Sequence, residues 1–67
     1  MSTFKFDVML DGRFVTTMSM PMPLKAIKGF CEGVAIINEK YLQKAAKAYA
    51  VKKRPSLKNK DIEVFAV

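Results

Sequence analysis

The dipeptide Asp11-Gly12, which lies between two segments of alternating apolar and polar residues, constrains the fold of this chain more than any other feature. Asp-Gly between two such segments is the strongest short-range signal for a β-hairpin. Before the turn, Phe4 and Phe6 begin an apolar series at every second position, which is the period of a half-buried strand. The same period continues after the turn. We therefore expect a hairpin over residues 3–20.

Two loop lengths are compatible with this hairpin, and they differ in which side chains share a face. A two-residue loop pairs Met9 with Phe14 and mixes polar and apolar side chains on both faces, because one register step moves every side chain to the other face. A three-residue loop from Leu10 to Gly12, ending in a left-handed glycine and followed by a bulge, pairs Val8 with Phe14 instead. Burying each large apolar side chain is worth about 1.5–3 kcal/mol, so the three-residue loop is favoured. It gathers on one face Phe4, Phe6, Val8, Phe14 and Met18.

The opposite face of the expected sheet is the first candidate interaction surface. It would carry apolar side chains from the hairpin and from the last strand, beside Lys5 and Asp7. That is more apolar surface than a small protein usually leaves exposed, so a second subunit or a partner protein is expected to cover it. The candidate protein-interface residues are Met9, Arg13, Val15, Phe65 and Val67.

Residues 24–53 place apolar side chains at helical spacing. The helical region should end near Lys53, because Arg54 precedes a proline and the residue before proline avoids helical geometry. A single helix of this length would be about 45 Å long. Strands of about seven residues span only about 23 Å, so such a helix would overhang its sheet.

A break near the middle of this region is therefore expected. Gly33 weakens a helix interior, and Asn38 is a favourable N-cap for a second helix. We predict two helical segments, over residues 23–35 and 38–53. An unbroken helix is the main alternative and would favour a dimer that covers the overhang. The alternative given least weight makes residues 33–37 a short strand.

Together these elements define an α+β fold with the order ββα(α)β. A hairpin alone is only marginally stable, so the sheet needs a third strand, and the segment 61–67 supplies it with period-two alternation. We place this strand antiparallel to the first. The expected fold is a single domain over residues 1–67, with a small three-stranded antiparallel sheet (hairpin 3–20 and strand 61–67) and one long or broken helix (23–53) packed on one face.

Composition argues against catalysis and against a metal centre. The chain has no histidine and a single cysteine, so an internal disulfide and a Cys/His zinc site are both excluded, as is catalysis that depends on histidine. Cys31 lies beside the apolar stripe and is expected to be a small core residue. We expect no enzyme, no cofactor and no metal. No apolar run approaches the roughly 20 residues that span a bilayer, and no signal-peptide pattern begins the chain, so a soluble, cytoplasmic protein without membrane contact is expected.

The positive charge is concentrated in the second half of the chain. The formal net charge is +6, from 12 Lys plus Arg and 6 Asp plus Glu. Residues 38–60 contain one acidic residue, Glu39, and eight basic residues: Lys40, Lys44, Lys47, Lys52, Lys53, Arg54, Lys58 and Lys60. The first three follow the spacing i, i+4, i+7 and should line one helix face. A solvated lysine face is the simpler interpretation, and a surface that follows phosphate groups is the functional one.

The sequence therefore predicts a small, basic, non-enzymatic module with a macromolecular partner. Nucleic acid, or a complex associated with nucleic acid, is the favoured partner, contacted through the eight basic residues. The alternative is a protein–protein interaction module, such as a small inhibitor, an assembly subunit or a homodimer. It would use the outer sheet face and the Met-Pro connector "MSMPMP" of residues 18–23. The small size is also compatible with an origin in a phage or a mobile element.

Overall fold

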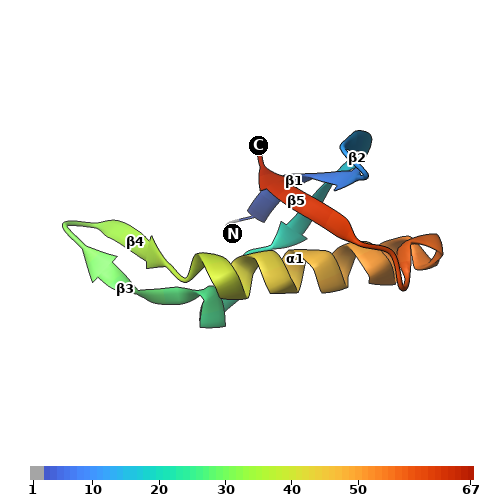
Figure 1. Cartoon of the computed structure of the whole chain (residues 1–67). Coiled ribbons are helices and arrows are strands. Elements are labelled where there is room, and N and C mark those ends of the chain that lie inside the picture. The colour runs from blue at the N-terminus through green and yellow to red at the C-terminus, as the bar shows by residue number, and fades with distance from the viewer. Residues whose placement is uncertain (1–2) are drawn as a thin grey trace.

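The structure analysed is a computed structural model that describes residues 3–67, and within this range strands outnumber helices (Figure 1). In chain order the elements are β1 (Thr3–Leu10), β2 (Arg13–Pro21), the 3-10 helix η1 (Leu24–Ala26), β3 (Ile27–Cys31), β4 (Val34–Ile37), α1 (Glu39–Lys53), the 3-10 helix η2 (Pro55–Leu57) and β5 (Ile62–Ala66).

The first, second and last strands form an antiparallel sheet in the order β2-β1-β5. β1 lies in the centre, and the C-terminal strand pairs with it antiparallel, as predicted. The helix α1 packs against one face of this sheet (Figure 1). The predicted α+β class, the three-stranded antiparallel sheet and the helix on one face are thus confirmed.

The turn between β1 and β2 corrects the predicted loop length. Leu10 pairs with Arg13, so the loop contains two residues and not three. Asp11 has φ 53° and Gly12 has φ 75°. Positive φ at both central residues defines a type I′ turn, whose twist matches that of the strands it joins. Because the turn satisfies the strand twist by itself, Leu10 remains part of β1.

With a two-residue loop and regular pairing, polar and apolar side chains would be mixed on both faces. A bulge farther along the hairpin avoids this and restores one apolar face. The register shifts between Val8 and Met9, so that Met9 pairs with Phe14 while Val8 pairs with Thr16. Val15 is the extra residue. A bulge inserts one residue into one strand and moves all subsequent side chains to the other face. β1 therefore directs its alternate apolar side chains toward the helix, as predicted.

Two residues near the bulge do not lie where the sequence placed them. Phe14, predicted to be in the core, is 60% exposed and pairs with Met9 on the outer face. Val15, predicted to lie on the outer face, packs against the core. Both corrections follow from the position of the bulge. Phe14 lies before the bulge and keeps the register set by the two-residue turn, whereas the register changes by one residue at Val15.

Residues 23–35 do not form the predicted helical segment: apart from the 3-10 helix η1, this stretch consists of strands and a turn, so this part of the prediction is wrong. β3 and β4 pair antiparallel as a second hairpin, here called the arm (residues 27–37). Its turn residues, Glu32 and Gly33, have φ 52° and 79°, which again defines a type I′ turn. The alternative given least weight, a strand within residues 33–37, is the one that the structure supports.

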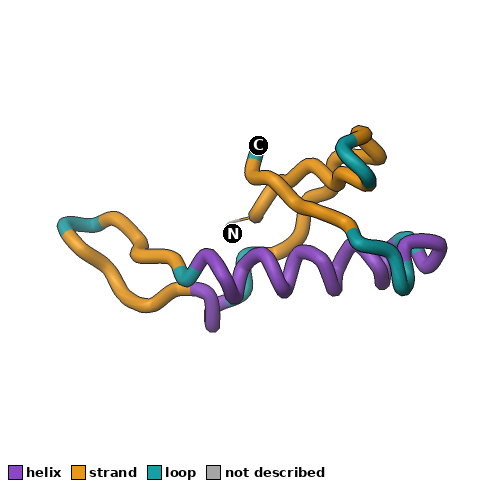
Figure 2. The backbone as a smooth tube through the Cα atoms, viewed as in Figure 1, coloured by secondary structure: helices purple, strands orange, loops and turns teal. Residues whose placement is uncertain are grey.

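The arm is attached to the rest of the molecule at its base. The backbone N–H of Asn38 donates to the carbonyl oxygen of Ala26 at 2.7 Å, which closes the hairpin where it meets α1. From there the arm extends beyond both the sheet and the helix (Figure 2). The molecule consequently measures 40 × 20 × 19 Å.

The second predicted helix is confirmed as α1. Asn38 is its N-cap, since its Oδ1 accepts a hydrogen bond from the backbone N–H of Tyr41 at 3.3 Å. Ala46 and Ala50 are completely buried on the side that faces the sheet. Their small side chains allow the helix backbone to approach the strands closely. Within residues 3–67, no helix is long and apolar enough to cross a membrane.

The core lies between α1 and the sheet, and Leu57 from η2 closes one end of it. Phe6 and Val8 are the largest completely buried side chains. The Phe6 ring stacks on Phe4, with centroids 5.5 Å apart, and meets the Tyr49 ring edge-on at 6.4 Å. No charged side chain of the described residues is buried, so all the charge of this part of the chain faces solvent. The buried residues are Phe6, Val8, Met20, Ala26, Leu42, Ala46, Ala50, Leu57, Ile62 and Val64.

The positive φ of Gly12 generates the first testable prediction. A Cβ at position 12 meets no neighbouring atom, so the cost of Gly12→Ala is conformational. We expect it to lower the free energy of unfolding by about 1–2 kcal/mol, the penalty of left-handed geometry for a residue with a Cβ. Chemical denaturation monitored by circular dichroism measures this loss.

Gly29→Ala is the matched control, because position 29 is equally open and its φ is not positive. Alanine there restricts the unfolded chain and should leave stability unchanged or raise it by about 0.4–1 kcal/mol. Equal losses in the two variants would contradict the turn assignment.

Candidate functional site

Three of the eight predicted basic residues lie together on one exposed face of α1. Lys40, Lys44 and Lys47 are all exposed, whereas Leu42, Ala46 and Ala50 on the opposite side are buried. A helix rises 1.5 Å per residue, so the first and last of these lysines are about 10 Å apart along its axis. The helix therefore presents a short, regularly spaced row of ammonium groups, here called the lysine row (Lys40, Lys44 and Lys47).

The other five basic residues cluster around the C-terminal end of α1. Lys52 and Lys53 belong to its last turn, where the partial negative charge of the helix dipole favours cations. The Nζ of Lys53 lies 5.5 Å from the centroid of the Tyr49 ring, a cation–π contact that orients this side chain. The remaining three, Arg54, Lys58 and Lys60, are exposed in the segment that returns from the helix to β5.

All eight basic residues thus lie along one continuous stretch of structure, from the start of α1 through η2 to the approach of β5. None of them is buried. The sequence predicted this set, and the structure brings its members onto one helix face and one helix end.

The five predicted interface residues divide between the two faces of the sheet. Met9 and Phe65 lie on the outer face, as predicted, and Phe65 also lines a groove beside the N-terminal end of α1. Val67 follows β5, where its backbone N–H donates to the carbonyl of Lys5, and its side chain is exposed. Arg13 and Val15 are misplaced by the prediction, because both line a shallow hollow with Leu10 on the side of the core.

The outer face carries a polar pair beside its apolar side chains. Asp7 and Thr17 form a cross-strand pair in which Oγ1 of Thr17 donates to Oδ1 of Asp7 at 2.6 Å. Phe14, Met9 and Phe65 contribute a small apolar cluster beside this pair. Among the apolar side chains of this face, Phe14 takes the place that the sequence gave to Val15.

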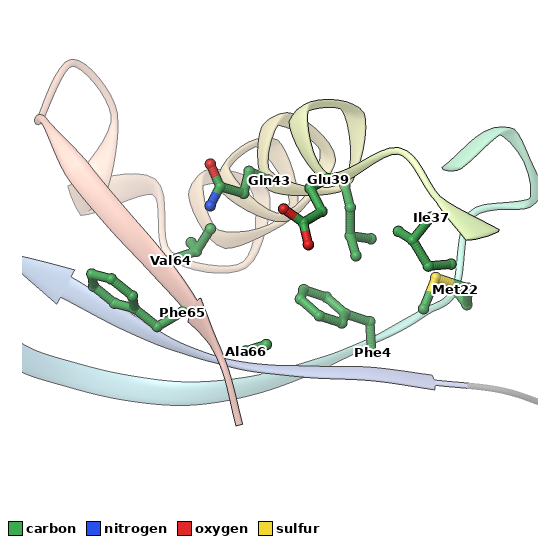
Figure 3. Close-up of a pocket in the computed structure, with 9 residues that line it drawn as sticks. Phe4, Met22, Ile37, Glu39, Gln43, Val64, Phe65 and Ala66 are labelled. Carbon is green, nitrogen blue, oxygen red and sulfur yellow. The ribbon is translucent and has the colours of Figure 1, made fainter. Parts of the chain in front are cut away.

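A groove at the N-terminal end of α1 is a site that the sequence did not reveal. Its volume is about 380 Å³, and apolar side chains from β1, the Met-Pro connector and the arm base form its walls. Glu39 and Gln43 extend over it from the helix, above the ring of Phe4 (Figure 3). The lining residues are Phe4, Met22, Ile37, Glu39, Leu42, Gln43, Val64, Phe65 and Ala66.

Residues 3–67 contain no group of three or more His, Cys, Asp or Glu side chains that could hold a metal ion. Cys31 is not the core residue that the sequence predicted, because it lies exposed next to the arm turn. This correction follows from the arm, which carries Cys31 away from the apolar core.

Comparisons of the chain with protein-family models, with curated proteins and with solved structures find no match. The function proposed below therefore rests on the geometry and chemistry of the chain itself.

The arm has sequence signals that could have been recognised, whereas the groove has none. Val34, Ile36 and Ile37 are β-branched and follow a glycine, which is typical of a strand after a tight turn. Glu32-Gly33 resembles Asp-Gly in chemistry, although glutamate is less common in left-handed geometry. The groove left no comparable signal, because its walls come from four separate segments of the chain.

The N-cap of α1 generates the second prediction, because it marks the point where the arm ends and the lysine row begins. Asn38→Ala removes the acceptor for the Tyr41 N–H and should lower the free energy of unfolding by about 1 kcal/mol. Asn38→Asp keeps an acceptor and adds a negative charge at the positive end of the helix dipole, so it should retain or increase stability. Thermal unfolding followed at the helical circular-dichroism band measures both. A loss in Asn38→Asp equal to that in Asn38→Ala would contradict the cap.

Proposed function

We propose that this chain is a small non-enzymatic module that binds nucleic acid through the lysine row and the basic end of α1. The observation that carries the proposal is the arrangement of eight exposed cations along one helix and the segment that follows it, with Glu39 as the single acidic residue among them. Polyanions are the partners that such a surface attracts most strongly.

The shape of this surface supports contact with the phosphate backbone. The lysine row is straight and solvated, and it stands on a helix whose opposite side is locked to the sheet by Ala46 and Ala50. A rigid row of ammonium groups can follow successive phosphates without ordering a flexible segment, so less entropy is lost on binding. Release of condensed counterions then provides the free energy.

The composition of the surface favours binding without sequence selectivity. Seven of the eight residues are lysines, and lysine interacts with phosphate as a point charge. Reading bases in the major groove relies on arginine, asparagine or glutamine forming two hydrogen bonds to one base edge. Arg54 is the single arginine in the set, so we expect affinity to depend on salt and length more than on sequence.

The protein–protein alternative based on the Met-Pro connector gains less support. Met20 is buried in the core and Met22 packs against it, so the connector serves mainly to close the fold. On the outer face, Arg13 and Val15 are turned away and Phe14 takes the place of Val15, so the candidate interface set differs from the predicted one. The basic surface unites eight exposed residues on one helix and the segment that follows it, and it is the one that we assign to the function.

A titration across a salt series provides the third prediction. Fluorescently labelled duplex and single-stranded oligonucleotides are titrated with the protein, and anisotropy reports binding. If about five phosphates are contacted, the logarithm of the association constant should fall against the logarithm of salt concentration with a slope near −4.5 for duplex and −3.5 for single strands. The absence of binding at the lowest salt concentration would refute the proposal.

A pair of charge-matched variants locates the surface. Lys44→Glu with Lys47→Glu should weaken binding and reduce the magnitude of the salt slope by about 2, because two phosphate contacts are lost. The control, Lys5→Glu with Lys25→Glu, makes the same change in net charge at two exposed lysines outside the proposed surface. This control pair should retain most of the slope of the logarithm of the association constant against the logarithm of salt concentration. Equal effects of both pairs would show that net charge alone, and not this surface, governs the interaction.

A further inference from the structure

The arm makes few contacts with the rest of the molecule. A two-stranded hairpin is marginally stable on its own in water, and here the arm contacts the remainder of the molecule chiefly at its base. Its side chains are nevertheless apolar on both faces. Phe30 is 70% exposed, Val34 is 67% exposed and Ile36 is 45% exposed. An apolar, projecting hairpin of this kind needs a partner surface.

The total surface area is larger than that of a compact monomer of this mass. The chain exposes 5218 Å², whereas a typical folded monomer of 7.5 kDa exposes about 4,200 Å². The radius of gyration is 12.6 Å, against about 11 Å for a compact chain of this length. The excess surface is about 1,000 Å², close to the roughly 800 Å² that each partner buries in a stable interface.

The register of the arm shows which face is complementary to the groove. Phe30 pairs with Ala35, and Ile27 pairs with Ile37, so these four side chains share one face. Ile37 is also part of the groove wall and points into it beside Met22 (Figure 3). The apolar surface therefore runs without interruption from the groove onto the arm face that carries Phe30.

From this continuity we infer that the partner of the arm is a second copy of this chain. Two arms packed antiparallel, with their Phe30 faces together, place the tip of each arm beside the base of the other. Because the groove lies at the arm base, each Phe30 then enters the groove of the partner copy. One two-fold axis generates both contacts, so the interface is isologous and closes without forming a filament.

Charge at the groove is complementary to charge on the arm. Glu39 extends over the groove, and the arm carries Lys28 two residues before Phe30. When Phe30 occupies the groove of the partner copy, this lysine lies near the rim that bears Glu39. The pair helps to set the orientation of the two copies, while apolar burial supplies most of the free energy.

A dimer would carry the proposed nucleic-acid-binding surface twice, once on each chain. A dimer of two chains with net charge +6 each presents two lysine rows on one particle, and linked sites raise overall affinity without new contacts. The arm and groove do not include any of the eight basic residues. Self-association and nucleic-acid binding can therefore fail or succeed independently.

Sedimentation equilibrium over a range of micromolar concentrations, without nucleic acid, tests the inference. We expect a reversible monomer–dimer equilibrium. Phe30→Glu should raise the dimer dissociation constant at least about 30-fold, since it removes a buried aromatic anchor. Added salt should strengthen dimerisation, because it screens the repulsion between two positive chains, whereas it weakens nucleic-acid binding.

Phe14→Glu is the matched control, because Phe14 is similarly exposed but lies on the outer sheet face. It should leave the dimer intact. Ala66→Trp, which fills the groove from β5, provides a second test and should produce a monomer with unchanged helical circular dichroism. A wild-type chain that stays monomeric at all concentrations and salts would overturn the inference. Loss of the dimer in Phe14→Glu but not in Phe30→Glu would also overturn it, since the outer face would then be the interface.

Discussion

The packing of α1 against one face of the three-stranded sheet is the contact on which the other features of this structure depend. Ala46 and Ala50 are completely buried against the sheet, whose own contribution is centred on Phe6 and Val8. Small residues on the helix and large ones on the strand interlock, so the helix is fixed in position and in rotation. Since rotation decides which residues face solvent, the same contact directs the lysine row outward and places Glu39 over the groove.

The parts of the fold that follow from local pattern were predictable from the sequence. The alternation in β1 and β5, the helical spacing of α1 and the cap at Asn38 each agree with a single local structure. The side of β1 that is buried was also predictable, because burying Phe6 and Val8 outweighs any preference of the turn. The structure achieves this face with a type I′ turn and a bulge at Val15, where the sequence suggested a longer loop.

The arm could not be predicted from spacing, because its apolar residues satisfy two periods at once. Ile27, Phe30 and Val34 recur at intervals of three and four, which is the helical period. In the structure these residues belong to two strands. A bulge near Lys28 and the turn at Glu32-Gly33 interrupt the two-residue alternation, and this produces the helix-like spacing. The candidate basic surface was predictable because it needs only one helix, whereas the groove depends on tertiary contacts among distant segments.

The way in which the arm is anchored has a consequence for how this protein can vary. Its base is closed by the hydrogen bond between Asn38 and Ala26, and neither strand of the arm belongs to the main sheet. Residues can therefore be added or removed in cross-strand pairs near Glu32-Gly33 without disturbing the helix or the core. A change in arm length would therefore alter the inferred contact between two copies while leaving the basic helix in place.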